Sequence, residues 1–250
     1  TPIAPNRNRI PLSGALVGIA IPAVIFLLIL FLDTRVHSKK DIQGVVSVPF
    51  LGEIPIDKKQ KKNKKKKGKH VMDDDMWAET SNSVKEAMRI LRTNMSFMAK
   101  KDNPLKVVTF TSFNEGAGKT FIAKTLAKSL VNAKKSVVVV DLDIRKGTLS
   151  RSMPKHVAGV SNYLADNTVT LDDIIHVGEP EKTPDVIACG PIAPNPAELL
   201  MDERLDELVA ELRSRYDYVI VDNVPVGIIA DASIANRIAD LTIFVMRAER

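Results

Sequence analysis

The chain has 250 residues, of which 45% are hydrophobic and 26% are charged, and its formal net charge is +6. A chain of this length and apolar content buries a core large enough for one α/β domain with an appendage. Its single cysteine, Cys189, excludes an intramolecular disulfide and fits a reducing compartment, and no His/Cys cluster has the spacing of a zinc site.

A long apolar stretch lies near the start of the chain. Residues 10–32 carry no formal charge over 23 positions, and about 20 apolar residues are enough for a helix to cross a bilayer. Pro22 is tolerated inside such a helix, while a buried helix of a soluble domain is the alternative. Basic residues are more frequent after the stretch than before it, which places the carboxyl side in the cytoplasm. We therefore expect a transmembrane helix over residues 10–32.

Residues 33–78 have the composition of a juxtamembrane linker. Nine lysines between Lys58 and Lys69 form a low-complexity run that repels itself, which is typical of a disordered segment. Without these nine lysines the formal charge of +6 becomes −3, so the basic balance belongs to the linker and does not predict binding of nucleic acid. The run is either a solvated tether or a contact with anionic membrane lipid.

The segment 79–98 has the periodicity of an amphipathic helix. Its apolar residues recur at spacings of four, three and four positions: Val84, Met88, Leu91 and Met95. Three charged residues fall on a different face: Glu86, Arg89 and Arg92. From the charge spacing alone, this second face is a solvated ladder of side chains.

The motif with the clearest chemistry lies between a β-branched run at 106–111 and a helix-periodic stretch at 121–132. Small residues there let backbone amides curl around a polyphosphate, a lysine neutralises phosphate oxygens, and a threonine hydroxyl ligates Mg²⁺. Phe113 replaces the first glycine of the usual motif, and a chance Gly-Lys-Thr turn is the alternative. The pattern predicts binding of ATP and Mg²⁺ by Asn114, Glu115, Gly116, Ala117, Gly118, Lys119 and Thr120.

Two further apolar runs end in carboxylates. Residues 136–140 lead into Asp141 and Asp143, and residues 218–221 lead into Asp222. Doubly wound sheets bind ligands at the carboxyl ends of their strands, so we expect these carboxylates beside the phosphate loop. Together they predict magnesium coordination and a general base, whereas each taken singly could be an ordinary turn residue.

The alternation of strands and helices predicts an α/β fold with a doubly wound, mainly parallel sheet of the P-loop NTPase type, preceded by one transmembrane helix. Strands are expected near 106–111, 136–141, 185–188, 217–222 and 241–246. Helices are expected near 79–98, 119–132, 171–176, 197–214 and 231–238.

Taken together, these segments resemble the bacterial tyrosine kinases of the polysaccharide co-polymerase type, which are related to the deviant-loop ATPases of chromosome and septum positioning. The deviant-loop ATPases carry a signature lysine where this chain has Asn114, which favours the kinases. The resemblance covers essentially the whole chain. Three segments match kinase motifs: Glu86-x-x-Arg89-x-x-Arg92, Asp141-x-Asp143-x-Arg145, and residues 190–200 with the sequence GPIAPNPAELL.

One kinase motif is altered in this chain. The family's Asp-Thr-Pro-Pro box is Asp-Asn-Val-Pro here, so only Asp222 and Pro225 carry over from it. The resemblance implies an ATP-dependent protein tyrosine autokinase that regulates polymerisation and export of capsular or extracellular polysaccharide. Lys119 would bridge the β- and γ-phosphates, and Asp141 would orient or deprotonate the acceptor hydroxyl. Magnesium would be held by Thr120, with Asp143 and Asp222 nearby; the roles of Asp141 and Asp143 can exchange, because both lie near the metal.

The resemblance also implies partners and a location. It implies a homo-oligomeric ring, commonly an octamer, with Glu86, Arg89 and Arg92 between subunits. The acceptor would be the tyrosine tail of a neighbouring subunit, and a phosphatase and the polysaccharide export machinery would be partners. Residues 1–9 would end a periplasmic proline-rich segment, and 79–250 would form the cytoplasmic kinase domain below the bacterial inner membrane. A periplasmic domain and a first membrane helix would precede Thr1, and the tyrosine tail would follow Arg250.

Two other functions compete with the kinase. A deviant-loop ATPase positions cargo through nucleotide-dependent dimerisation, but the missing signature lysine and the apolar stretch at 10–32 argue against it. A structural co-polymerase with a vestigial nucleotide site is the other alternative. The retained Lys119, Thr120 and three aspartates argue against that one.

Overall fold

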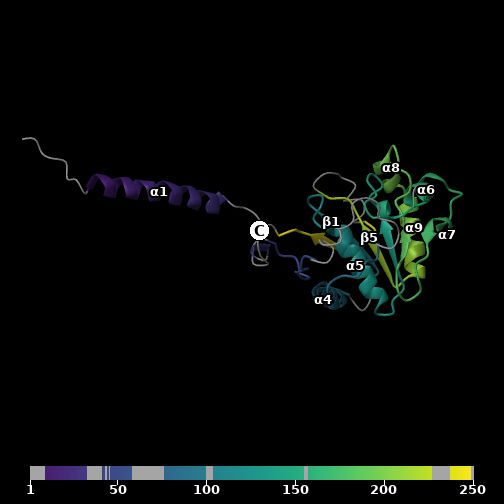
Figure 1. Cartoon of the computed structure of the whole chain (residues 1–250). Helices are drawn as coiled ribbons and strands as arrows, with labels where there is room; N and C mark the ends of the chain where they lie inside the picture. The colour runs from purple at the N-terminus through teal and green to yellow at the C-terminus, as the bar shows by residue number, and fades with distance from the viewer. Residues whose placement is uncertain are drawn as a thin grey trace, which may run out of the picture. The chain divides into compact units, whose positions relative to one another are not determined.

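The protein is represented by a computed structural model that describes residues 9–32, 41–42, 44, 46–57, 76–99, 104–154, 157–226 and 237–248. The chain divides into two compact units (Figure 1), Thr1–Ser47 with Ala248–Arg250, and Val48–Arg247. The predicted lysine-rich linker at 58–69 lies outside the described residues.

The first unit contains one long helix, α1 (Arg9–Leu32), with Pro22 inside it. Large apolar side chains between positions 19 and 32 are 51–87% exposed. Within the described part of the chain, no helix combines the length and the apolarity needed to cross a membrane.

The second unit is built on a sheet with the strand order β3-β4-β2-β5-β1-β6. All neighbouring strands are parallel except β3 and β4, which are antiparallel. The strands are β1 (Val107–Ser112), β2 (Val137–Asp141), β3 (Ile175–His176), β4 (Asp185–Ile187), β5 (Tyr218–Asp222) and β6 (Leu241–Val245).

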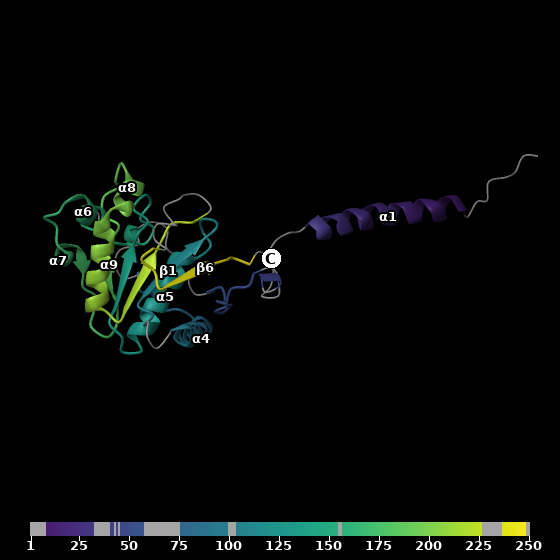
Figure 2. The same cartoon turned by 180° about the vertical axis from the view of Figure 1, so that it is seen from behind.

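Helices cover both faces of this sheet, as Figure 2 shows from behind. One face packs against α6 (Val160–Ala165), α7 (Leu171–Ile174), α8 (Pro196–Met201) and α9 (Glu203–Arg215). The other packs against α4 (Asn82–Met98) and α5 (Lys119–Val131). The doubly wound, mainly parallel sheet predicted from the sequence is therefore confirmed.

Alternation along the strands explains the two buried faces. In β2, Val138 and Val140 belong to the core beneath α9, whereas Val137 and Val139 belong to the core beneath α5. Successive side chains of a strand point to opposite faces, so a strand covered on both sides has to be apolar throughout. Fully burying one such side chain contributes about 1.5 to 3 kcal/mol. The polar residues come only where the strand ends, at Asp141.

The predicted elements differ from the structure at three places. The single helix expected over 197–214 is wrong: α8 ends and α9 begins around Asp202, whose Oδ1 accepts the backbone N–H of Arg204 at 2.9 Å and caps α9. The helix expected over 171–176 ends at Ile174, and the next two residues form β3. The helix α6 was not predicted. Most of the helix expected over 231–238 lies outside the described residues.

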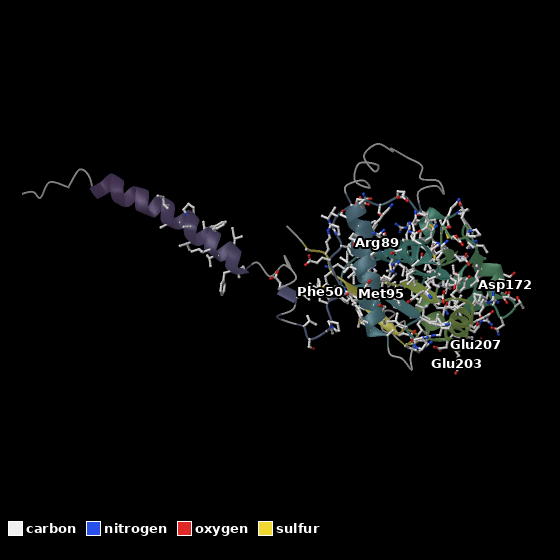
Figure 3. The ribbon with its side chains drawn as sticks, turned by 90° about the horizontal axis from the view of Figure 1, so that it is seen from below. Phe50, Arg89, Met95, Asp172, Glu203 and Glu207 are labelled. Carbon is white, nitrogen blue, oxygen red and sulfur yellow. The ribbon has the colours of Figure 1, made fainter. Side chains whose placement is uncertain are left out.

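Residues 48–57 pack against α4, at the side of the unit seen in Figure 3 with Phe50, Arg89 and Met95 labelled. Asn94 Nδ2 donates to the carbonyl of Leu51 at 2.7 Å. Asp57, only 7% exposed, accepts the backbone N–H of Ser81 at 3.2 Å, just before α4 begins. Residues 48–57 are thus attached to this helix by hydrogen bonds at two points.

Candidate nucleotide site

The predicted phosphate loop connects β1 to α5. Gly116 and Gly118 have φ values of +74° and +105°, in the left-handed region that favours glycine. No atom lies within 4 Å of the position that a Cβ would take at either residue. The two glycines are therefore required by the backbone conformation and leave open space around the loop. Gly118 is also the N-cap of α5, whose free N–H groups favour an anion.

Lys119 and Thr120 begin α5, so their side chains lie at its amino terminus. Thr120 Oγ1 donates to Asp222 Oδ2 at 2.6 Å, which joins the phosphate loop to the end of β5. Lys119 Nζ donates to Ser112 Oγ at 3.3 Å, and Ser112 Oγ donates to the carbonyl of Asn114 at 2.6 Å. The structure therefore brings together the lysine, the hydroxyl and one of the three predicted carboxylates.

Asp141 and Asp222 are paired in register on the adjacent strands β2 and β5. Asp141 has 0% exposure; its Oδ2 accepts from the backbone N–H and hydroxyl of Ser150, and its Oδ1 accepts from the backbone N–H of Asp143. Burial raises the pKa of Asp141 to about 6, although the Ser150 donors oppose the shift. Burial, assisted by the charge of Asp141, raises the pKa of Asp222 to about 7.

A cavity of about 490 Å³ lies in front of the loop. Asp143 lines it, whereas Asp141 and Asp222 are not among its lining residues. Sequence reasoning assigned no role to several of the residues that complete the lining. These are Phe121, Arg145, Lys146, Thr148, Arg151, Val224 and Pro225.

The missed basic residues come directly after β2. Lys146 forms an ion pair with Glu115 of the phosphate loop, and this pair holds the pKa of Glu115 below its usual range. Ligands of doubly wound sheets bind beyond the carboxyl ends of strands, so the basic residues at 145, 146 and 151 were candidates by position. Arg145 falls in the Asp-x-Asp-x-Arg motif, but no motif singled out Lys146 or Arg151, because nothing in their spacing shows that the chain turns back toward the phosphate loop.

The polar groups fit a magnesium nucleotide. Among the described side chains, Asp222 Oδ1 is one of the buried oxygens without a hydrogen-bond partner, although Oδ2 is bonded to Thr120. In the same part of the chain, no group of three or more His, Cys, Asp or Glu residues could hold a metal ion by itself. Mg²⁺ suits such a site because it takes one or two protein oxygens and completes its shell with phosphate oxygens and water.

The charged residues of α4 differ in their surroundings. Glu86 Oε2 accepts from Arg89 Nη1 at 2.9 Å, and both side chains are exposed, with relative exposures of 61% and 67%. Arg92 is partly buried instead, and its Nη1 donates to the carbonyl of Ser129 in α5 at 2.7 Å. The predicted ladder is thus an exposed pair together with a contact between two helices of the same chain.

Comparison with known proteins identifies the family of this chain. Residues 105–250 match the AAA domain family. A relative from Klebsiella pneumoniae, named as a tyrosine-protein kinase in the cps region, is 32% identical over 99% of this chain, but the chain spans only 35% of that relative. The tyrosine-protein kinase CpsD of Streptococcus agalactiae is 30% identical over 67% of this chain and 71% of its own length.

Solved structures of tyrosine kinase domains are similar to most of this chain. The kinase domain of the Escherichia coli tyrosine kinase ETK has a TM-score of 0.72 and 27% identity, covering 84% of this chain and 82% of its own. The BceF tyrosine kinase domain has a TM-score of 0.72 and 30% identity, covering 86% and 87%. The chain belongs to the AAA domain family and, within it, to the bacterial tyrosine-protein kinases that include Wzc and CpsD.

Proposed function

We propose that this protein transfers the γ-phosphoryl group of ATP to tyrosine hydroxyls of its own kind, and that this autokinase activity regulates polymerisation and export of capsular or extracellular polysaccharide. The observation that carries the proposal is the bond between Thr120 and Asp222, which places a phosphate-loop hydroxyl beside a buried, partly unpaired carboxylate. The cps-region relative supports the link to polysaccharide.

The phosphate loop provides the nucleotide end of the site. Its backbone N–H groups, from Asn114 to Thr120, bind phosphate oxygens, and Lys119 bridges the β- and γ-phosphates. Thr120 would hold Mg²⁺, and Asp143 and Asp222 would lie near it. The metal, when bound, neutralises charge that develops on the phosphate oxygens during transfer. The protein contributes mainly by positioning and by this charge arrangement.

The acceptor hydroxyl needs a group that orients it or takes its proton. Asp141 has this role in our proposal, since a carboxyl with a pKa of about 6 is a stronger base than an ordinary aspartate. Asp143 lines the cavity and competes for the role. The variants Asp141→Asn and Asp143→Asn separate them: the base variant keeps ATP binding but loses transfer, whereas the metal-site variant weakens binding of Mg²⁺-ATP.

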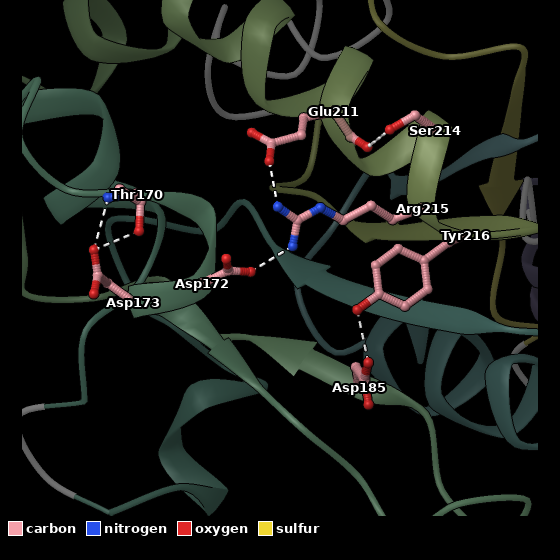
Figure 4. Close-up of polar contacts among 8 residues, drawn as sticks. All are labelled: Thr170, Asp172, Asp173, Asp185, Glu211, Ser214, Arg215 and Tyr216. Atoms are coloured by element: carbon pink, nitrogen blue, oxygen red, sulfur yellow. Dashed lines mark hydrogen bonds and ion pairs between the residues drawn. The ribbon is translucent and has the colours of Figure 1, made fainter.

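The acceptor tyrosine comes from outside the described chain in this proposal. None of the three tyrosines lines the cavity. Tyr163 is 7% exposed, and the Tyr216 hydroxyl donates to Asp185 Oδ2 at 2.6 Å (Figure 4). Tyr216 lies before the first residue of β5, whereas Asp222 is the last residue of that strand. A tyrosine tail of a neighbouring subunit in a ring is the proposed acceptor, with a phosphatase and the export machinery as further partners.

Residues 10–32 are proposed to anchor the protein in the bacterial inner membrane, with the kinase unit in the cytoplasm. The support is the 23-residue stretch without formal charge. The side chains of residues 10–17 lie outside the described ones. Carbonate-washed membranes should retain a protein that begins at Thr1, and the same protein without residues 10–32 should stay in the supernatant. Retention of both versions would show that residues 10–32 are not the membrane anchor.

The activity is tested with labelled ATP and the full-length protein. Lys119→Met keeps much of the side-chain volume but removes the charge that contacts phosphate, so phosphotyrosine should be lost while the melting temperature is kept. Lys124→Met, a substitution in the same helix away from the phosphate loop, is the matched control. Phosphotyrosine at the unsubstituted level in Lys119→Met would refute the proposed site.

A further inference from the structure

Ser150 lies behind the nucleotide cavity and has no part in the scheme above. It begins the short 3₁₀ helix η2 (Ser150–Ser152). Its backbone N–H and its hydroxyl both donate to Asp141 Oδ2, at 2.9 Å and 2.6 Å. Because Asp141 has 0% exposure, these donors replace the water that would solvate its carboxylate. Two of the hydrogen bonds to this carboxylate therefore come from one residue.

A further bond fixes the direction of the Ser150 hydroxyl. The backbone N–H of Cys189 donates to Ser150 Oγ at 2.8 Å. With this donor on the oxygen, the hydrogen of the hydroxyl is directed to Asp141. Cys189 lies just after β4, which is the neighbour of β2 in the sheet. Ser150 thus connects the ends of two adjacent strands and presents a fixed donor to the carboxylate.

The turn that brings Ser150 back to β2 depends on Gly147. This residue has φ +54°, and a Cβ there would lie 2.4 Å from Cys189 Sγ. Its N–H donates to the carbonyl of Asp143 at 2.6 Å, and its carbonyl accepts from the N–H of Arg151 at 3.0 Å. Only a residue without a side chain allows this turn to pass so close to Cys189. The loop is therefore built to place Ser150 against Asp141.

We propose that Ser150 is a positioning residue for phosphoryl transfer, which holds the Asp141 carboxylate in the orientation in which Oδ1 also accepts the N–H of Asp143, at 3.1 Å. Ser150 acts through Asp141 and keeps both carboxylates of the Asp-x-Asp pair in one geometry. The inference rests on the proposed kinase activity. Ser150 is not among the residues that line the cavity, so its loss acts on the transfer step and leaves ATP binding intact.

The test uses the full-length protein and the initial rate of phosphotyrosine formation at a series of ATP concentrations. Ser150→Ala should lower kcat roughly tenfold or more, because hydrogen bonds to charged groups are among the stronger ones. The KM for ATP and the affinity for a fluorescent ATP analogue should stay within about twofold. Ser150→Thr keeps the hydroxyl and should restore most of kcat. Ser152→Ala, which removes a hydroxyl from the same 3₁₀ helix, is the matched control and should match the unsubstituted protein.

The outcomes separate this inference from the proposed function. No phosphotyrosine from the unsubstituted protein would refute the kinase activity itself. Full activity in Asp141→Asn would refute the role of Asp141, and with it that of Ser150. An inactive Asp141→Asn beside a fully active Ser150→Ala would overturn only the positioning role. A loss of ATP affinity or of melting temperature in Ser150→Ala, with Ser150→Thr equally impaired, would show that the residue is merely structural.

Discussion

The two buried carboxylates at the ends of β2 and β5 are costly to ionise. Asp141 and Asp222 lie opposite one another in register, and the charge of Asp141 adds to the cost of ionising Asp222. The Asp222 oxygen without a hydrogen-bond partner adds a further cost. Buried carboxyls with raised pKa values cluster at functional sites.

In the absence of nucleotide and Mg²⁺, the raised pKa of Asp222 makes the free energy of unfolding depend on pH. The folded-state pKa is about 7, and the ordinary value is 3.8. Between these values the unfolded chain is ionised while the folded one keeps its proton. The stabilising contribution of protonation is therefore complete below the lower value and is lost as pH rises through the upper one.

Asp222→Asn removes this titration, so it should stabilise the protein at pH 8 in the absence of nucleotide and Mg²⁺. We expect a gain on the order of 4 kcal/mol in the free energy of unfolding, because the shift spans about three pKa units and each unit corresponds to about 1.4 kcal/mol. The gain should shrink at pH 5, and phosphotyrosine formation should be lost. Denaturant titrations at the two pH values measure the effect; a variant less stable than the unsubstituted protein at pH 8 would contradict it.

At this scale, the sequence predicts residues whose function follows from their position at a strand end or in a glycine-rich loop. Lys119, Thr120 and Asp222 were found in this way, and the structure brings them together. Ser150 could not be found, since its contact with Asp141 depends on a turn in which Gly147 adopts a positive φ. A serine nine positions after a strand has no signal of its own.

At the scale of elements, the pair of helices α4 and α5 is held together by more than apolar packing. Met88 and Leu91 of α4 share a core with Leu126 and Leu130 of α5. Arg92 adds a charged hydrogen bond to the carbonyl of Ser129, in the last turn of α5, where a cation also interacts favourably with the helix dipole. The exposed pair of Glu86 and Arg89 has no such contact with α5 among the described interactions.

This difference divides Glu86, Arg89 and Arg92 of α4 into two roles. Arg92→Ala should lower the free energy of unfolding by about 1 to 3 kcal/mol, because it leaves a partly buried carbonyl without its charged donor. Arg89→Ala should change stability by less than about 0.5 kcal/mol, because its ion pair is exposed. Thermal denaturation of both variants tests the prediction, which would be wrong if the two variants had equal stability.

Assembly into an oligomer can be measured separately for variants of the same helix. If the exposed face of α4 lies between subunits, Glu86→Ala with Arg89→Ala should reduce the mass measured by light scattering while the melting temperature is retained. Arg92 is left unchanged in this variant, so lost stability cannot imitate lost assembly. An unchanged mass would leave the two residues as a solvated pair.

The elements themselves were predictable wherever one pattern runs through a whole segment. The apolar runs of β1, β2 and β5 were placed to within about one residue, which is closer than boundaries are usually predicted. The elements that were predicted wrongly depend on features that the pattern of a segment does not reveal. Asp202 caps α9 and interrupts the expected helix, and β3 is only two residues long, so it has no period to detect.

At the scale of the whole molecule, none of the three tyrosines lines the cavity beside the phosphate loop. Figure 4 shows Tyr216 beside Arg215, which bonds to Glu211 and Asp172. Burial, with the bond to Asp185, raises the pKa of Tyr216, so its hydroxyl is a poorer nucleophile than a free tyrosine. This end of the sheet is stabilised by a polar network, and it offers no acceptor to the cavity.

Because none of the described tyrosines lines the cavity, we expect one molecule to phosphorylate the tail of another. To test this, the full-length protein with Lys119→Met and an intact tail is mixed with an active full-length protein from which the tail is deleted. Phosphotyrosine should form on the Lys119→Met chain, because the intact phosphate loop of one molecule acts on the tail of the other. Neither protein alone should give a signal.

Assembly should control the same reaction. Glu86→Ala and Arg89→Ala are then added to both proteins of the mixture. The phosphorylation rate per protein molecule should fall and become proportional to protein concentration, because contact then depends on diffusion instead of a lasting interface. If each interface needs this surface from both subunits, restoring Glu86 and Arg89 in only one of the two proteins should leave the rate low. A rate unaffected by the substitutions would show that transfer between molecules does not need the exposed surface of α4. If the Lys119→Met chain gains no phosphotyrosine in the mixture, while the unsubstituted protein with its tail phosphorylates itself, the reaction occurs within one molecule.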